Sequence, residues 1–382
     1  MTMNTTIIRK TSFRETRRKC LTLLAALAMA CLCANAQPLT PQANENVELM
    51  GILSRMAGYP EYRMDVAGQY IKDIDSCFKD YAEHPAVLRM KELRNTYGIA
   101  YDAVMSMAIH LQKKGNAFSL VNEEPSTLDA RWDKVDKAKF LDLLADFYRD
   151  SRFHHFFENH KEVYEKGIRA YDEEVARHLD INWYESFYGN KPEEKYSVII
   201  GFCNGHGNYG VNRHAKGKEK EVFAIVGYSV NQENQPQYSK GYLSTLVHEF
   251  NHSFVNCLLD EQKYPDHVKE LERAGSFLYL TAQATMRQQA YGTWQTMINE
   301  SLVRAAVICY MMDKGYAPEE VRNELLVQIQ RDFRWTPELV RLLRKYEKKR
   351  NRYANLESFY PHIIRFFTDY AEKEHKRMDI MD

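Results

Sequence analysis

Cysteine pairs, long apolar runs and an excess of one charge are all scarce in this sequence of 382 residues. The seven cysteines form no CxxC pair, which excludes a zinc ribbon and a thioredoxin motif. Lysine plus arginine equals aspartate plus glutamate at 52 each, so the charge gives no case for binding nucleic acid. With 45% apolar and 27% charged residues, the composition excludes a collagen and a wholly disordered chain.

The start of the chain is typical of an export signal. Residues 1–36 hold six basic side chains against one acidic one, and residues 21–33 form an apolar run. As a helix this run is about 20 Å long, too short for a hydrocarbon core of about 30 Å. Ala34-Asn35-Ala36 then provides the small residues that signal peptidase requires. We therefore predict a signal peptide over residues 1–36, export to the periplasm or cell exterior, and no stable membrane insertion after cleavage. An uncleaved N-terminal anchor is the alternative.

The mature chain changes character near residue 191. Residues 37–46 are polar with two prolines and indicate a flexible leader. Residues 47–190 carry apolar residues at spacings of three and four, which predicts an N-terminal region built of helices. Residues 191–382 begin with short β-branched runs and continue as helix, which predicts a second region with a small β-sheet. The expected fold class is α+β, mostly α.

Two β-branched runs, residues 196–202 and 221–227, predict adjacent strands, and we expect these strands to be antiparallel. The stretch between them is rich in glycine at residues 204–210 and cannot be helical. We expect it to form a rim beside the strands, where glycine lets another group approach the backbone closely.

An HExxH motif, His248-Glu249-Phe250-Asn251-His252, follows the predicted strands. Residues four apart share one face of a helix, so His248 and His252 can offer two imidazoles to one Zn²⁺. Glu249 lies beside them and can deprotonate a water that the metal activates. The flanking residues make a helix that is apolar almost all round, which indicates a buried helix whose polar side chains need partners. The sequence therefore predicts a zinc site at this motif.

A zinc site of this kind needs a third protein ligand. Leu258, six residues after His252, excludes the metzincin pattern, and Leu271 excludes the spacing of thermolysin-like enzymes. Glu300 is the better candidate, because it is one of only two charged residues in an otherwise apolar predicted helix.

The other charged residue of that helix is Arg304, one turn after Glu300. It can hold the Glu300 carboxylate in place for the metal. His267 and Asp260 stay open as alternative third ligands.

The HExxH motif followed by Asn299-Glu300 on a later helix resembles the gluzincin group of zinc metallopeptidases. More closely, the chain resembles secreted bacterial proteins of the family called domain of unknown function 4932, over most of its mature length. That resemblance rests on residues 48–55, the strand pair, the HExxH helix and the Asn-Glu helix. The gluzincin group implies a zincin-like catalytic region in residues 191–382, with Glu300 as a zinc ligand. The closer family implies a shared fold and no substrate.

The zincin resemblance also implies a strand edge along the substrate and a His or Tyr opposite the metal that stabilises the oxyanion. The glycine-rich rim suits the first role. His206 in the rim and Tyr353 near the C-terminus are our predicted residues for the second, with Tyr209 and Tyr360 as further candidates.

The leading hypothesis is an exported zinc metallopeptidase that hydrolyses peptide bonds in peptide or protein substrates. Two alternatives stay open. The fold could serve as a non-catalytic binding or scaffold module, or the metal site could hydrolyse a non-peptide amide such as cell-wall material. The sequence does not separate the amide classes, because attack by a metal-activated water serves any carbonyl. It leaves the oligomeric state open.

Overall fold

The computed structural model describes residues 39–123, 125–190 and 194–378, which belong to one unit. The predicted signal peptide, residues 1–36, lies outside the described residues. None of the described helices combines the length and the apolar character that crossing a bilayer requires. The unit is α+β and mostly helical, as the sequence predicted.

Helices dominate the first half of the unit, but one hairpin interrupts a region that the sequence predicted to be helical throughout. Strands β2 (Leu111–Lys114) and β3 (Ala117–Leu120) pair antiparallel. Their turn contains Gly115, whose φ of 62° is one that glycine adopts without strain. The Gly115-Asn116 dipeptide was the local signal for this hairpin. The helices of this half are α2 (Glu45–Met56), α3 (Gln69–Phe78), α4 (Pro85–Tyr97), α5 (Asp102–His110), α6 (Lys137–Asp150), α7 (Phe153–Asn159), α8 (Lys161–Glu174) and α9 (Asn182–Tyr188), with 3₁₀ turns η1 (Pro60–Tyr62), η2 (Lys79–Tyr81), η3 (Ala130–Trp132) and η4 (Ala176–His178).

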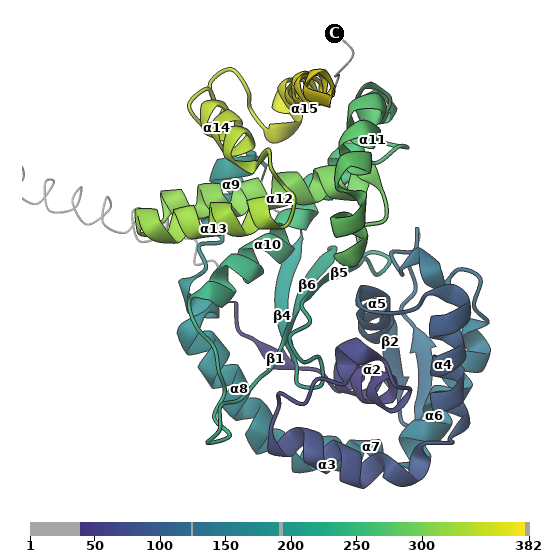
Figure 1. The fold of residues 1–382 in the computed structure, drawn as a ribbon. Coiled ribbons are helices and arrows are strands. Elements are labelled where there is room, and N and C mark those ends of the chain that lie inside the picture. The colour runs from purple at the N-terminus through teal and green to yellow at the C-terminus, as the bar shows by residue number, and fades with distance from the viewer. Residues whose placement is uncertain (1–38, 124, 191–193, 379–382) are drawn as a thin grey trace, which may run out of the picture. The chain divides into compact units, whose positions relative to one another are not determined.

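The central sheet has four strands in the order β1-β4-β6-β5. In the view of Figure 1 it lies between helix α8 on its left and helices α2 and α5 on its right. Its strands are β1 (Gln42–Ala43), β4 (Lys195–Gly201), β5 (Tyr209–Arg213) and β6 (Glu221–Gly227). Strands β4 and β6 are adjacent as predicted, but they run parallel, so the antiparallel prediction is wrong. The connection of residues 202–220 is long enough to bring the chain back to the edge where β4 begins, and it contributes β5 on the way. Strand β5 pairs antiparallel with β6 and is an edge strand of the sheet.

The stretch that the sequence marked as a flexible leader contributes to this sheet. Gln42 and Ala43 pair in parallel with Ile199 and Ile200 of β4. Helix α2 then begins at Glu45, with the Asn44 side chain accepting hydrogen bonds from the backbone at its start. Residues 42–46 are therefore part of the folded unit.

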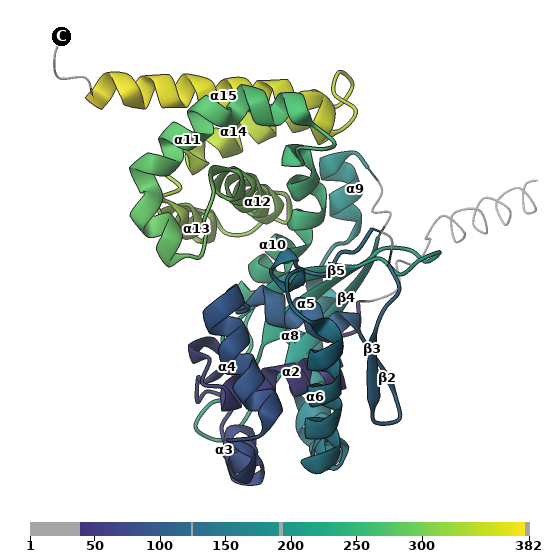
Figure 2. The ribbon, with the colours of Figure 1, turned by 90° about the vertical axis from the view of Figure 1, so that its right-hand side faces the viewer.

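The second half of the unit is built around one buried helix, α12. Helix α12 packs against α10, α11, α13 and α14, and α10 in turn packs against β5 and β6 (Figures 1 and 2). Almost every residue of α12 from Met297 to Met311 is buried, so any charged side chain on it must find a partner inside the protein. The helices of this half are α10 (Gly241–Val255), α11 (Pro265–Gln288), α12 (Trp294–Asp313), α13 (Pro318–Gln330), α14 (Thr336–Glu347) and α15 (Leu356–Met378), with the 3₁₀ turn η5 (Asn256–Leu259).

Candidate metal centre

The HExxH motif lies in the second half of helix α10. Leu246, Val247 and Phe250 fix this helix through full burial of their side chains. The helical repeat places His248 and His252 one turn apart, with their two Nε2 atoms 3.2 Å from each other. Both imidazoles therefore present the same ring nitrogen to the same point.

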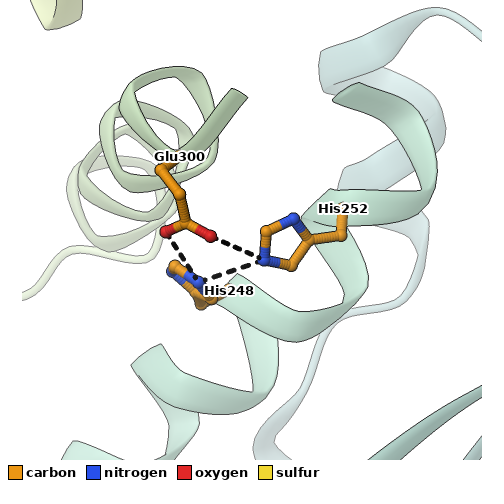
Figure 3. Close-up of side chains that lie close together, drawn as sticks. All are labelled: His248, His252 and Glu300. Carbon is orange, nitrogen blue, oxygen red and sulfur yellow. Dashed lines mark hydrogen bonds and ion pairs between the residues drawn. The ribbon is translucent and has the colours of Figure 1, made fainter. Parts of the chain in front are cut away.

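Glu300 reaches that point from the facing helix α12 (Figure 3). Its Oε2 lies 3.5 Å from Nε2 of His248, and its Oε1 lies 3.4 Å from Nε2 of His252. Among the residues that the structure describes, these three make up the one group of at least three His, Cys, Asp or Glu side chains with potential ligand atoms all within 4.8 Å. The structure thus brings together the three residues that the sequence predicted as metal ligands.

The spacing and chemistry of these atoms fit a divalent metal. Donor atoms at about 2.0–2.2 Å from a tetrahedral Zn²⁺ lie about 3.3–3.6 Å apart, which is close to the distances found here. Oε2 of Glu300 is buried, and it faces Nε2 of His248 as well as the guanidinium of Arg304. Imidazole nitrogens with free lone pairs and a carboxylate that face one another form a favourable arrangement when a metal cation lies between them.

The protonation states also suit a metal. Burial lowers the pKa of His248 to about 3, which keeps its imidazole neutral and leaves a lone pair free for coordination. Burial by itself raises the pKa of Glu300. Electrostatic interactions with His248, His252 and Arg304 are stronger than this effect and bring the pKa to about 2. Two neutral imidazoles and one carboxylate are the forms in which these side chains bind zinc.

Arg304 contacts the Glu300 carboxylate and holds it in place, as the sequence predicted. One of its guanidinium nitrogens lies 3.0 Å from Oε2 of Glu300. The same group donates to the Gln328 side chain at 2.9 Å and to the Tyr291 hydroxyl at 2.6 Å. These contacts fix the guanidinium and through it the direction of the carboxylate.

Tyr291 and Gln328 were missed by the sequence analysis, because neither lies on a helix face that periodicity connects to the motif. Tyr291 is positioned by the end of α11, where Ala290 adopts a left-handed φ of 65°. The Tyr291 N–H then donates to the Met286 carbonyl at 2.9 Å, which closes the helix end and turns the chain toward α12.

Asn256 was also missed. Its side-chain oxygen lies 3.1 Å from Nδ1 of His252. An acceptor there places the proton on Nδ1 and leaves the lone pair of Nε2 facing Glu300 and His248. Asn256 follows His252 by four residues, so the helical spacing was a signal that could have found it.

Glu249 lies on the strand side of the motif and is almost fully buried. Burial raises its pKa to about 7, although electrostatic interaction with the Arg304 guanidinium and a hydrogen bond from the Gly210 backbone N–H both oppose this shift. A Cβ atom on Gly210 would lie 2.8 Å from Oε2 of Glu249, so a larger residue at this point of β5 would displace the Glu249 carboxylate. The glycine-rich segment thus approaches the motif closely, as the sequence predicted for its rim.

Two cavities meet at this centre. The first, of about 510 Å³, lies between the start of α5, strand β5 and the loop before α12, and we call it the β5-side cavity. The second, of about 330 Å³, lies between the start of α10 and helix α13, and we call it the α13-side cavity. Both are lined by His248, Glu249, Tyr291 and Asn208. The centre is therefore reachable from two sides.

The structure does not bring the other predicted catalytic residues to this centre. His206 is exposed and lines neither cavity, because the turn at residues 204–207 ends before β5 reaches α10. Tyr353 lies in the connection between α14 and α15, where its hydroxyl is 2.7 Å from Nε2 of His362. His206 was predicted from its place in the glycine-rich rim and Tyr353 from its residue type, and neither residue lines a cavity at this centre.

The alternative third ligands also lie elsewhere. Nδ1 of His267 is 2.9 Å from the Leu258 carbonyl, and the ring stacks on Tyr360. Asp260 is exposed and accepts hydrogen bonds from the backbone of residues 262 and 263. Glu300 is the candidate that faces both histidines.

Comparison with known proteins identifies a family and no further relative. The model of the family described as Domain of unknown function (DUF4932) matches residues 39–366. Neither a curated protein nor a solved structure matches the chain.

Proposed function

The chain belongs to the DUF4932 family, and from the geometry of its candidate metal centre we propose that it is an exported zinc metallopeptidase of the gluzincin-like type. The observation that carries the proposal is the Glu300 carboxylate, 3.4–3.5 Å from the Nε2 atoms of His248 and His252. In this proposal those three side chains hold Zn²⁺. The region around helix α10 is then a zincin-like catalytic region.

The bound metal would supply a Lewis acid that polarises the substrate carbonyl and acidifies water. Glu249 is the carboxylate next to the ligands, and it borders both cavities. In this role it accepts a proton from the attacking water and then donates it to the leaving amine. The Gly210 N–H that hydrogen-bonds to Glu249 orients the carboxylate for both transfers.

The two cavities support a substrate that extends to both sides of the reacting bond. A peptide chain can occupy the β5-side cavity and the α13-side cavity at once, since both open on His248 and Glu249. Arg304 and Tyr291 do not touch the reacting atoms in this scheme. They hold Glu300 in position.

The test compares the protein of residues 37–382 with its Glu249→Gln variant. We expect about one zinc per chain in both proteins by mass spectrometry, because Glu249 is not a ligand. Hydrolysis of a mixed peptide library should fall by at least about 100-fold in the variant, the loss expected for removing a general acid and base. Full activity of the variant would contradict the role of Glu249.

The alternative functions are outcomes of the same measurement. Cleavage of muropeptides without cleavage of peptides would favour a cell-wall amidase. Absence of zinc from a folded wild-type protein, after zinc has been offered, would favour a binding or scaffold module.

A further inference from the structure

Tyr101 has a backbone conformation that side chains rarely adopt. Its φ is 53° and its ψ is −123°, at the N-terminal cap of α5. Gly68 has nearly the same angles, 57° and −123°, at the cap of α3. Glycine adopts these angles freely, whereas a tyrosine is strained in them. Strain of this kind persists where the surrounding structure enforces it, and it is concentrated at functional sites.

A network of hydrogen bonds enforces the conformation. The Tyr101 N–H donates to Oε1 of Glu61 at 3.2 Å, and the Tyr62 hydroxyl donates to the Tyr101 carbonyl at 3.0 Å. Glu61 is buried and is itself paired with Arg94 at 2.6 Å. Three side chains from outside α5 therefore fix the direction of one tyrosine.

The Tyr101 ring is covered by the protein only in part, with the guanidinium carbon of Arg94 lying 5.8 Å from its centroid. The Tyr101 side chain is 43% exposed, so much of its apolar surface is in contact with water. Tyr101 lines the β5-side cavity, together with the α10 and α12 side chains of the metal centre. A buried tyrosine could offset its strain by burying its ring, but this one leaves the ring accessible.

The chemistry of the cavity gives the exposed ring a role. The other tyrosines on its wall are engaged, since Tyr209 is buried against Tyr62 and the Tyr291 hydroxyl accepts from Arg304. Most of the remaining lining residues are polar, and Tyr101 is the exposed aromatic residue among those that line this cavity. An aromatic face of this kind favours contact with another ring or a bulky aliphatic group.

We propose that Tyr101 is a specificity residue, which binds a bulky apolar or aromatic side chain of the substrate in the β5-side cavity. The proposal rests on the proposed function, because it treats this cavity as part of a peptide-binding cleft. The strained cap of α5 then serves to aim the ring at the substrate.

The first test measures binding without turnover. Zinc-loaded Glu249→Gln protein is titrated with alanine-based peptides that carry one phenylalanine at successive positions, and with the all-alanine peptide. Adding Tyr101→Ala should weaken binding of the best phenylalanine peptide by about 3- to 10-fold and leave the all-alanine peptide unchanged. Tyr101→Phe should keep the affinity, because the ring remains. Tyr81→Ala is the matched control, since this half-buried tyrosine of η2 lines neither cavity.

The second test uses the strain itself. Tyr101→Gly should leave the melting temperature unchanged or raise it by about 1–3 °C, because glycine adopts these angles freely. A fall of several degrees, together with unaltered peptide affinity, would show that the ring supports the fold and would overturn the proposal. Loss of affinity in Tyr101→Phe as large as in Tyr101→Ala would also overturn it, because the hydroxyl and not the ring would then act.

The two proposals can fail separately. If wild-type protein cleaves the peptides but Tyr101→Ala keeps its preference for phenylalanine, the specificity role is wrong and the peptidase stands. If no peptide is cleaved but Tyr101→Ala still weakens binding, the peptidase is wrong and the binding role stands. If no peptide is bound or cleaved, both are wrong.

Discussion

Two glutamates are buried in this protein in opposite surroundings. Glu48 of α2 is 1% exposed, and Glu300 of α12 is 6% exposed. The Glu48 carboxylate accepts from the Tyr70 hydroxyl at 2.8 Å and from the Phe202 N–H at 2.7 Å. Both donors are neutral, and burial raises the pKa of Glu48 to about 7. Glu300 faces two imidazoles and a guanidinium, and its pKa is brought to about 2.

The difference shows what distinguishes a candidate site from a buried polar contact. Each oxygen of Glu48 has a hydrogen-bond donor from within the protein, so the group is satisfied and joins α2 to the end of β4. Oε2 of Glu300 is ion-paired with Arg304, the carboxylate also faces the Nε2 atoms of His248 and His252, and it borders the β5-side cavity. Burial is common to both, but of the two only Glu300 combines ionisation, two facing imidazole nitrogens and access to a cavity.

The largest expected effect is on zinc affinity. Glu300→Gln keeps the shape of the side chain and removes the charge, so we expect zinc affinity to fall by more than about 100-fold. Glu48→Gln makes the same chemical change at a buried glutamate outside the site and should alter zinc affinity by less than about twofold. Competition titration against a chelator of known affinity measures both.

An equal effect of the two substitutions would break the comparison, because zinc affinity would then depend on general stability. Unaltered zinc affinity in Glu300→Gln would remove Glu300 from the ligand set.

The next effect is on stability as a function of pH. The folded protein keeps the proton of Glu48 up to about pH 7, whereas the unfolded chain loses it near the ordinary pKa of 4.5. Between these values the folded state binds more protons, so the free energy of unfolding falls as the pH rises through this window. From pH 5 to pH 8 we expect Glu48 to remove about 2–3 kcal/mol. Urea unfolding of wild type and Glu48→Gln at both pH values measures this contribution of Glu48. The variant should not show it, because its amide does not titrate.

The opposite sign, with wild type gaining stability relative to Glu48→Gln as the pH rises, would place a cation near Glu48. It would then resemble Glu300, and the contrast between the two would disappear.

Local patterns predicted the elements of this fold better than their arrangement. The helical spacing of residues 47–190 and the β-branched runs before and after the glycine-rich stretch were sufficient to predict most helices, β4 and β6. The parallel direction of β4 and β6 was not predictable in this way. It depends on β5 and on the two-residue strand β1, which are too short to give a periodic signal.

The same distinction between local patterns and spatial arrangement applies to the candidate site. The four-residue spacing along one helix predicted His248 and His252 as metal ligands. A carboxylate in an otherwise apolar helix predicted Glu300 as the third. Contacts between elements could not be predicted from local patterns. Nothing local in the sequence connects Tyr101 at the cap of α5, or Tyr291 in the α11–α12 loop, to helix α10. For the same reason, neither the rim position of His206 nor the residue type of Tyr353 was enough to predict which residues line the two cavities.

The smallest expected effect is at Asn256, where the contact with the site is exposed to water. Asn256→Ala removes the oxygen 3.1 Å from Nδ1 of His252, so zinc affinity should fall by only about 3- to 10-fold, since water can replace the acceptor. Asn256→Asp places a carboxylate at the same point and should keep or increase the affinity, because a charged acceptor makes the imidazole a stronger ligand. The chelator competition used for Glu300 measures both variants. A lower affinity in Asn256→Asp than in Asn256→Ala would mean that this side chain does not set the His252 tautomer, and the determinants of the site would then end at Glu300 and the residues that hold it.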